Sequence, residues 1–507
     1  MKRVFTIITA LALSAFIVIG PSLSSFAVER SYTYNYDYWG DVQDSPDVYS
    51  VCKVFTSTDL GLEKKLSSPQ GVYVHDKSVF VMDSGNNRIL EFERKSRESL
   101  ELVRIIDSIK GCDVTNLSTP TDMAISEDGN IFIADKGNGR IVKVDQDLNY
   151  IMEFTKPDES SLDKDLVFAP SKLTLDTAER VYCIASGINK GLIKYENDGT
   201  FSGFVGATQV VFNFKDYIYK KIASQEQLAR MESFVPTEYD NLYMDHEGFI
   251  YACTSNVAEE DLKSGDADAV RRLNLLGNDI LIRNGVYYDG DFPIYGDLYM
   301  GSGGGYEGNS KFTDVTAFEN NSYVCLDRNR GRLFGYDEQG RMIFICGGAG
   351  NMDGYFRYPI ALDHMDYDLI VVDQLDCSVT IFTLTEFGQL VFDAMDLFDD
   401  GYYSASQAKW DEVIKYNGNY DLAYIGEGRA YLRQKDYKTA MEYFELKYDA
   451  DNYSKAYKQY RKEWVEDHIA IIVIVILLIF LIPLGIGKVK QLKFEIAKSD
   501  AFKYNNN

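Results

Sequence analysis

The chain has 507 residues, of which 77 are acidic and 52 basic, and its formal net charge at pH 7 is −25. A surface this acidic repels polyanions, so the composition argues against a nucleic-acid partner and suits cations or neutral sugars better. The seven cysteines are spread singly, and an odd number in an exported chain forbids complete pairing. Disulfide bonds are therefore not expected to be the main support of the fold.

The first 27 residues have the pattern of an export signal. Lys2 and Arg3 precede an apolar run over residues 4–20, and Ser25, Phe26 and Ala27 give the small-x-small spacing of a cleavage site. The pattern predicts a signal peptide over residues 1–27, with an uncleaved anchor as the alternative. The Tyr- and Asp-rich stretch over residues 28–49 is predicted to be an extended leader.

A repeat organises the next part of the chain. Pro120 is followed by an apolar run and a turn, by a second apolar run that ends at Asp135, and by another turn before Arg140 opens a third run. This pattern predicts consecutive short strands. The same pattern stands 52 residues upstream, where Asp83 and Arg88 occupy the places of Asp135 and Arg140. A third copy carries Asp327 and Arg332, and a fourth has a second run that ends at Asp373. Two weaker copies follow Pro170 and Pro236.

Six copies of three or four strands predict a mainly β fold, a six-bladed β-propeller over residues 50–390, because one blade cannot bury both faces of its sheet alone. The last copy is short of an outer strand. We expect residues 51–55 to supply that strand and so to close the ring and protect its edges.

The repeated Asp, Gly, Asn, Arg turn and the glycine-spaced linker CGGAGNMDGYFRYP, residues 346–359, resemble those of NHL-repeat propellers. As a whole, the chain resembles bacterial exported NHL-repeat proteins often labelled gluconolactonase-like and encoded beside carbohydrate ABC transporters. The resemblance implies a role near carbohydrate transport, but it implies no measured activity. Gluconolactonase-type sites hold a divalent ion with carboxylate and amide oxygens, so an enzyme of this kind would use a cation such as Ca²⁺.

The loops between second and third strands share one face with the linkers between blades, and most insertions fall on this face. It is therefore the predicted binding surface. The candidate ligand-binding residues are Asp83, Asn86, Arg88, Asp135, Asn138, Arg140, Tyr306, Asp327, Arg332 and Asp373. The alternative is structural: the aspartates satisfy backbone donors of their own turns, and the arginines pair with acids of neighbouring blades.

The sequence nominates no catalytic residue and no metal ligand. Of four histidines, His75, His246 and His364 fall near the hairpins on the opposite face, and His468 adjoins an apolar segment. A zinc lyase would need several imidazoles converging at the channel, and no nucleophile elbow or Ser/His/Asp order is present.

Helical periodicity begins after residue 385. Tyr403 and Tyr437, Trp410 and Phe444, and Ala394 and Gly428 align at a spacing of 34 residues, which resembles the tetratricopeptide repeat. The prediction is a helical domain over residues 391–468, with a capping third helix over 453–467. The candidate residues of its partner groove are Tyr403, Trp410, Gly428, Tyr431, Tyr437 and Phe444.

Residues 469–487 carry no charge, and a helix of this length spans about 28 Å, the thickness of a bilayer core. Five lysines follow, which predicts a cytoplasmic tail over residues 488–507 and an extracytoplasmic propeller. A buried core helix is the alternative.

Together these features predict a single-pass membrane protein that binds or assembles: the propeller takes a ligand, such as a carbohydrate, and the helical repeats hold a protein partner, such as an ABC transporter component. The rival hypothesis is a metal-dependent sugar lactone hydrolase or lyase.

Overall fold

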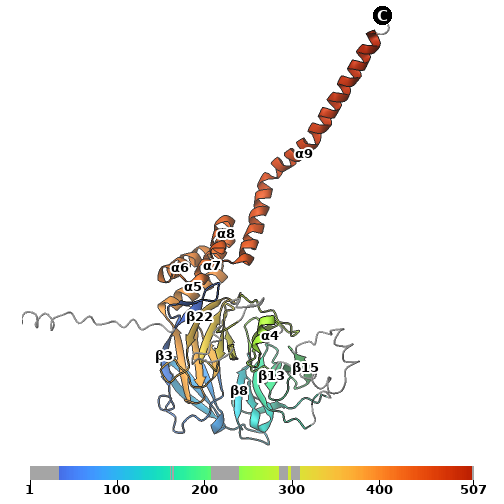
Figure 1. The fold of residues 1–507 in the computed structure, drawn as a ribbon. Helices are drawn as coiled ribbons and strands as arrows, with labels where there is room; N and C mark the ends of the chain where they lie inside the picture. The colour runs from blue at the N-terminus through green and yellow to red at the C-terminus, as the bar shows by residue number, and fades with distance from the viewer. Residues whose placement is uncertain are drawn as a thin grey trace, which may run out of the picture.

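The computed structural model describes residues 33–159, 162, 165–206, 239–265, 267–284, 295–297 and 309–504 (Figure 1). The predicted signal peptide and Tyr306 lie outside the described residues.

Six sheets form the blades of a β-propeller, which confirms the predicted fold and blade number. The first three blades contain β4 Gly71–His75, β5 Ser78–Asp83, β6 Arg88–Ser96 and β7 Ser99–Ile106; β8 Pro120–Ile125, β9 Ile131–Asp135, β10 Arg140–Val144 and β11 Tyr150–Phe154; and β12 Pro170–Leu175, β13 Val181–Ala185, β14 Leu192–Tyr195 and β15 Phe201–Val205. The fourth and fifth contain β16 Asn241–Met244, β17 Ile250–Cys253 and β18 Val270–Leu273, and β19 Phe312–Ala317, β20 Tyr323–Asp327, β21 Arg332–Tyr336 and β22 Met342–Gly347. The short helix α4 Glu259–Ser264 lies between β17 and β18.

The sixth blade closes the ring. It consists of β23 Pro359–Met365, β24 Asp368–Asp373 and β25 Ser378–Leu384, with β3 Tyr49–Phe55 as its outer strand. β3 pairs antiparallel with β25, so that Phe55 lies opposite Val379. This confirms the predicted closure, which joins the start of the propeller to its end and leaves no open edge between first and last blades.

The innermost strands of the blades, β4, β8, β12, β16, β19 and β23, contact one another around the central axis. The second strands are almost fully buried between neighbouring sheets. Cys183, Cys253 and Cys325 lie at similar places in these strands, fully buried, and all seven cysteines are free. As predicted, these three are small core residues, and apolar packing between blades supports the ring.

The leader forms a small hairpin of β1 Tyr34–Tyr36 and β2 Val42–Asp44, and β1 lies beside β22. Four helices follow β25 directly: α5 Glu386–Asp399, α6 Tyr403–Tyr416, α7 Asp421–Arg433 and α8 Tyr437–Leu446. α5, α6 and α7 pack on blades five and six (Figure 1), where Phe387 and Phe392 of α5 share one apolar core with Phe318 and Phe344, and α8 packs on α7 and α9.

The last helix, α9 Ala450–Tyr504, is one continuous helix that bends along its length and leaves the rest of the molecule (Figure 1). The predicted third helix over residues 453–467 is therefore not a separate element, since nothing interrupts the helix before the apolar segment. Pro483 lies inside the helix. Within the described residues, α9 is the one helix long and apolar enough to cross a membrane, and its apolar part is not buried in the protein. The alternative of a buried core helix is excluded by this exposure.

Candidate functional site

The repeated aspartates act inside their own blades. Asp83 accepts hydrogen bonds from the backbone N–H of Ser67, from Asn86 Nδ2 and from Arg88 Nε, each at 2.7 Å. The second blade repeats this arrangement at Asp135, which accepts from Ser118 N at 2.7 Å, Asn138 Nδ2 at 2.7 Å and Arg140 Nε at 3.0 Å. Both aspartates are completely buried. The backbone donors lie in the linkers before the blades and not in the turns that the aspartates begin, so the predicted bonding within each turn is wrong for these two aspartates.

The arginine partners differ from the prediction. Arg88 and Arg140 pair with the aspartates of their own turns, so the expected pairing with acids of neighbouring blades is wrong for both. The reason is register: each arginine opens a third strand directly opposite the aspartate that ends the second strand. Residues opposite one another in an antiparallel pair place their side chains within bonding reach.

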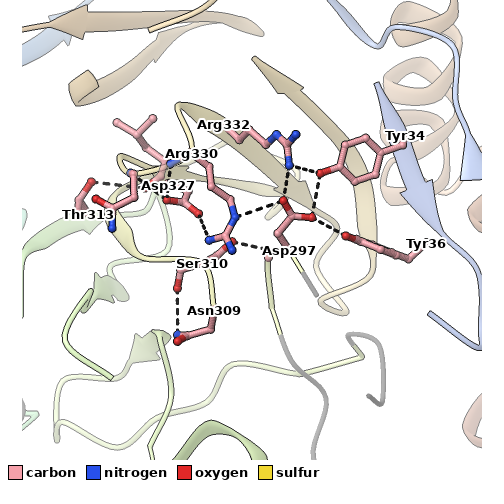
Figure 2. A network of polar contacts seen from close by, with 12 residues as sticks. Tyr34, Tyr36, Asp297, Asn309, Ser310, Thr313, Asp327, Arg330 and Arg332 are labelled. Carbon is pink, nitrogen blue, oxygen red and sulfur yellow. Dashed lines mark hydrogen bonds and ion pairs between the residues drawn. The ribbon is translucent and has the colours of Figure 1, made fainter. Parts of the chain in front are cut away.

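The fifth blade departs from this pattern (Figure 2). Arg330, three residues after Asp327, pairs with it at 3.2 Å, whereas Arg332 turns to Asp297 and to Tyr34 of the leader. Tyr34 and Tyr36 both donate to Asp297. Burial and the adjacent Asp297 raise the pKa of Tyr34, so its hydroxyl stays protonated. This network fastens β1 to blade five.

Among the described residues, the hydrogen-bond donors to Asp373 of the sixth blade are all backbone N–H groups. The donors are Arg357 and Tyr358, both at 2.8 Å, and Leu375 and Asp376, both at 2.9 Å. The described candidates from the repeat thus satisfy turns or fasten the leader, and they are not brought together in one pocket.

A different site lies in the channel. A cavity of about 500 Å³ is lined by residues from all six inner strands and by hairpin residues such as Lys77 and Asp366. It therefore lies toward the hairpin face, opposite the repeated turns. Its polar lining includes Tyr73, Asp122, Lys172, Asn241, Tyr243, Asp314, Asp363 and His364.

Three carboxylates of this cavity bridge adjacent blades. Asp122 accepts from the N–H of Leu173 at 2.9 Å, Asp314 from that of Leu362 at 2.8 Å, and Asp363 from that of Val74 at 2.7 Å. Asn241 also donates to Asp314. Each carboxylate thereby satisfies a backbone donor of the next blade and keeps acceptor capacity for a ligand.

Lys172 lines the same cavity. Among the described residues its ammonium group has no hydrogen-bond or ion-pair partner, although the nearby carboxylates act on it electrostatically. Burial disfavours its charge, but the field of Asp122 and Asp314 outweighs burial and raises the pKa of Lys172. The cavity therefore holds a cation surrounded by acids and free to donate to a ligand.

Burial also changes the acids. It raises the pKa of Asp314 to about 6, an effect that Lys172 opposes, and it raises the pKa of Asp363 to about 7, against the hydrogen bonds from the N–H groups of His364 and Val74. Asp363 therefore exchanges its proton near neutral pH.

His364 lines the cavity next to Asp363. Its Nδ1 lies 2.7 Å from Thr316 Oγ1, and burial lowers the pKa of His364 to about 4, so the imidazole is neutral. Within the described ranges no group of three or more His, Cys, Asp or Glu side chains is arranged to hold a metal ion.

Sequence reasoning did not nominate these channel residues, but a signal was available. Asp122 and Lys172 each stand two residues after the proline that opens the blade, where the first and last blades have Gly71 and Ala361. A charge in the middle of an inner strand breaks the apolar pattern, and its variation between blades distinguishes it from the repeated turn.

The six groove candidates mostly pack within the helices. Trp410 and Phe444 are buried, and Phe444 lies against Gly428, where an added Cβ would come within 2.7 Å of the ring. Tyr403 contacts Phe398, Tyr431 stacks on Tyr443 with ring centres 5.6 Å apart, and Tyr437 is half-buried at the start of α8. Trp410, Phe444 and Gly428 therefore contribute to packing between the helices and do not line an open groove.

Comparison with known proteins agrees with the fold. The NHL repeat family matches residues 117–144, which cover β8 to β10 of the second blade. The protein is therefore a six-bladed β-propeller that contains an NHL repeat and continues into C-terminal helices. No curated protein matches its sequence.

Solved structures with similar folds are distant. They include virginiamycin B lyase from Staphylococcus aureus, with 11% identity, 66% of this chain and 100% of that chain covered and a TM-score of 0.37. A streptogramin B lyase gives 13% identity, 67% and 100% coverage and a TM-score of 0.38. A protein of unknown function from Bacteroides thetaiotaomicron gives 11% identity, 68% and 78% coverage and a TM-score of 0.41.

Proposed function

We propose that this protein is a membrane-anchored binding protein whose central cavity takes a small polyhydroxylated ligand such as a sugar. The observation that carries the proposal is the cavity itself, in which the carboxylates of Asp122, Asp314 and Asp363 surround the Lys172 ammonium, which has no ion-pair partner among the described residues. A hydroxyl group donates one hydrogen bond and accepts others, so neighbouring hydroxyls satisfy both kinds of group. Tyr73 and Tyr243 add aromatic surface to the lining.

The proposed anchor is the apolar part of α9. The lysines that follow residues 469–487 support a cytoplasmic C-terminus and an extracytoplasmic propeller. A tetratricopeptide-like partner role for α5 to α8, with a carbohydrate transporter subunit as the partner, rests on the resemblance alone.

The test uses the full chain in detergent micelles and follows its thermal unfolding with hexoses and their disaccharides. A ligand at a hundred times its Kd stabilises the folded protein by about 2.7 kcal/mol, which gives a measurable rise in Tm. We expect Lys172→Met to abolish the rise. The matched control is Lys95→Met, which removes an exposed lysine paired with Glu93. This variant should keep the rise in Tm. No rise with any sugar in the wild-type chain would refute the proposal.

A second candidate function, hydrolysis or elimination on a sugar lactone, is favoured by Asp363. A carboxyl group with a pKa of about 7 that lines a cavity is suited to accept or give a proton near neutral pH. Turnover of aldonolactones that is lost in Asp363→Asn, while sugar binding persists, would establish this function. Equal rates of lactone turnover in the wild type and in Asp363→Asn would exclude this function for Asp363.

A further inference from the structure

A second cavity lies where the leader, the propeller and the helices meet. Its volume is about 380 Å³, within the range of small-molecule sites. Its walls come from five segments: residues 35–38 of the leader, Asn284, the blade-five residues Tyr336, Arg341 and Met342, the α7 residues Asp421, Leu422 and Ile425, and residues 447–451 at the junction of α8 and α9. We call this the junction cavity.

Three exposed aromatic side chains gather at the junction cavity. The rings of Tyr38 and Tyr448, which line it, are stacked with centres 5.0 Å apart, and Trp39 meets Tyr448 edge-on at 5.1 Å. Their exposed fractions are 52% for Tyr38, 63% for Trp39 and 54% for Tyr448. Contiguous aromatic surface left open on a charged protein marks an interaction site.

Two ion pairs and two further acids, Asp37 and Asp451, line the junction cavity. Lys447 Nζ lies 2.6 Å from Asp421, and Arg341 lies 2.8 Å from Asp449. The cations and anions of the two pairs neutralise one another, while their remaining donors and acceptors can bond a ligand. Because Asp37 and Asp451 leave acids in excess, such a lining disfavours an anion, and its carboxylate oxygens suit a ligand rich in hydroxyl groups that donate to them.

We propose that the junction cavity binds a neutral saccharide, with one pyranose ring against the aromatic cluster of Tyr38, Trp39 and Tyr448 and its hydroxyls on the paired charges. A compact cavity of about 380 Å³ suits a ring better than an extended peptide. The site is separate from the central cavity and does not depend on the function proposed for it. Because residues 447–451 lead into α9, the ligand also holds the root of this helix to blade five and the leader.

Tryptophan fluorescence tests the proposal directly, because the chain has three tryptophans and Trp39 is the one at the site. Trp410 is buried, and Trp464→Phe removes the remaining exposed indole. The full-length W464F protein in detergent micelles is titrated with glucose, N-acetylglucosamine and their β-1,4-linked disaccharides. We expect a blue shift of Trp39 emission and weaker quenching by iodide.

Two variants and two controls define the result. Tyr448→Ala and, independently, Tyr38→Ala are expected to raise the Kd about tenfold, which corresponds to the loss of one good aromatic contact. Tyr416→Ala removes a tyrosine of α6 that is 52% exposed, and it should leave the Kd unchanged. Lys172→Met should also leave it unchanged, which distinguishes this site from the central cavity.

A second readout concerns the root of α9. Saccharide should slow hydrogen exchange of the backbone amides over residues 447–455 in the wild-type chain. Unchanged Trp39 emission with all four sugars, or equal affinity in both tyrosine variants and wild type, would overturn the site. If a proline-rich peptide but no sugar protected Trp39 from quenching by iodide, the ligand would be a peptide, and the saccharide proposal would also be overturned.

Discussion

The two ends of the propeller use polar residues in opposite ways. At the turn end, Asp83 and Asp135 recur with the same asparagine and arginine partners, and every described partner lies within the blade and its own linker. At the hairpin end, the channel residues differ from blade to blade, and Lys172 has no described partner. The comparison teaches that repeated polar residues build the blade, whereas polar residues that break the repeat mark the site.

The largest expected effect comes from breaking a repeated turn. Asp135→Ala removes the buried acceptor of the Ser118 N–H and of the Arg140 guanidinium, which keeps only the more exposed Glu153, at 3.1 Å, as a described acidic partner. Removing one partner of a buried ion pair costs about 3–5 kcal/mol. We expect the free energy of unfolding, measured by urea titration of the full chain in micelles, to fall by this amount.

The control for this turn is Asp128→Ala, in the exposed hairpin of the same blade. Surface substitutions of this kind change stability by about 0.5 kcal/mol or less. If Asp135→Ala and Asp128→Ala lowered the free energy of unfolding equally, the repeated aspartates would not be structural and would again be candidates for ligand binding.

The helices extend the comparison, because Gly428 also belongs to a repeated pattern. Gly428→Ala places a Cβ 2.7 Å from the Phe444 ring, and overpacking a filled core costs about 1–3 kcal/mol. Alanine otherwise favours a helix over glycine, so a loss of thermal stability would be due to the contact. Gly418→Ala, in the turn between α6 and α7 and with its nearest neighbour 3.9 Å away, is the control for an added methyl group that meets no filled core. A stabilised Gly428→Ala protein would show that the two helices can separate and leave a groove.

The pH dependence of stability tests the hairpin end. The pKa of Asp363 is about 7 and that of Asp314 about 6 in the folded protein, both above the value near 3.9 expected in the unfolded chain. The folded state therefore holds these protons more tightly, so their stabilising contribution is complete below about pH 4. It is lost as pH rises through 6 to 7, with a slope of at most about 1.4 kcal/mol per pH unit for each group.

Asp363→Asn should flatten the decline between about pH 4 and 7, measured as urea midpoints across that range. Asp128→Asn, on the surface of the second blade, should keep the wild-type slope. An unaltered slope in Asp363→Asn would show that this carboxyl does not hold a proton in the folded protein.

The sequence predicted the propeller because its evidence is local and repeated six times: strand lengths, turn residues and the missing outer strand supplied by β3. Residues 469–487 were equally clear, since composition alone distinguishes this segment. The candidate site was not found, because Asp122, Lys172, Asp314 and Asp363 are distant in sequence and meet only when the ring closes. Register decided the partners of Arg88 and Arg140, and no spacing argument had included the strand opposite each arginine.

The smallest loss of stability is expected in blade five, whose turn departs from the repeated Asp, Asn, Arg pattern. In blade five, Arg330 takes the place that asparagine has in the first two blades, which releases Arg332 to bond Asp297 and Tyr34 of the leader (Figure 2). Tyr34→Phe removes one hydroxyl from this network but leaves Tyr36 on Asp297, so we expect a loss of about 0.5–1.5 kcal/mol in urea titration and faster proteolysis of the leader. Tyr38→Phe, at an exposed ring of the same leader, should have no effect on either measurement. Equal proteolysis of both variants would mean that the leader is held by apolar contacts, and that Arg332, unlike Arg88 and Arg140, is available to a ligand.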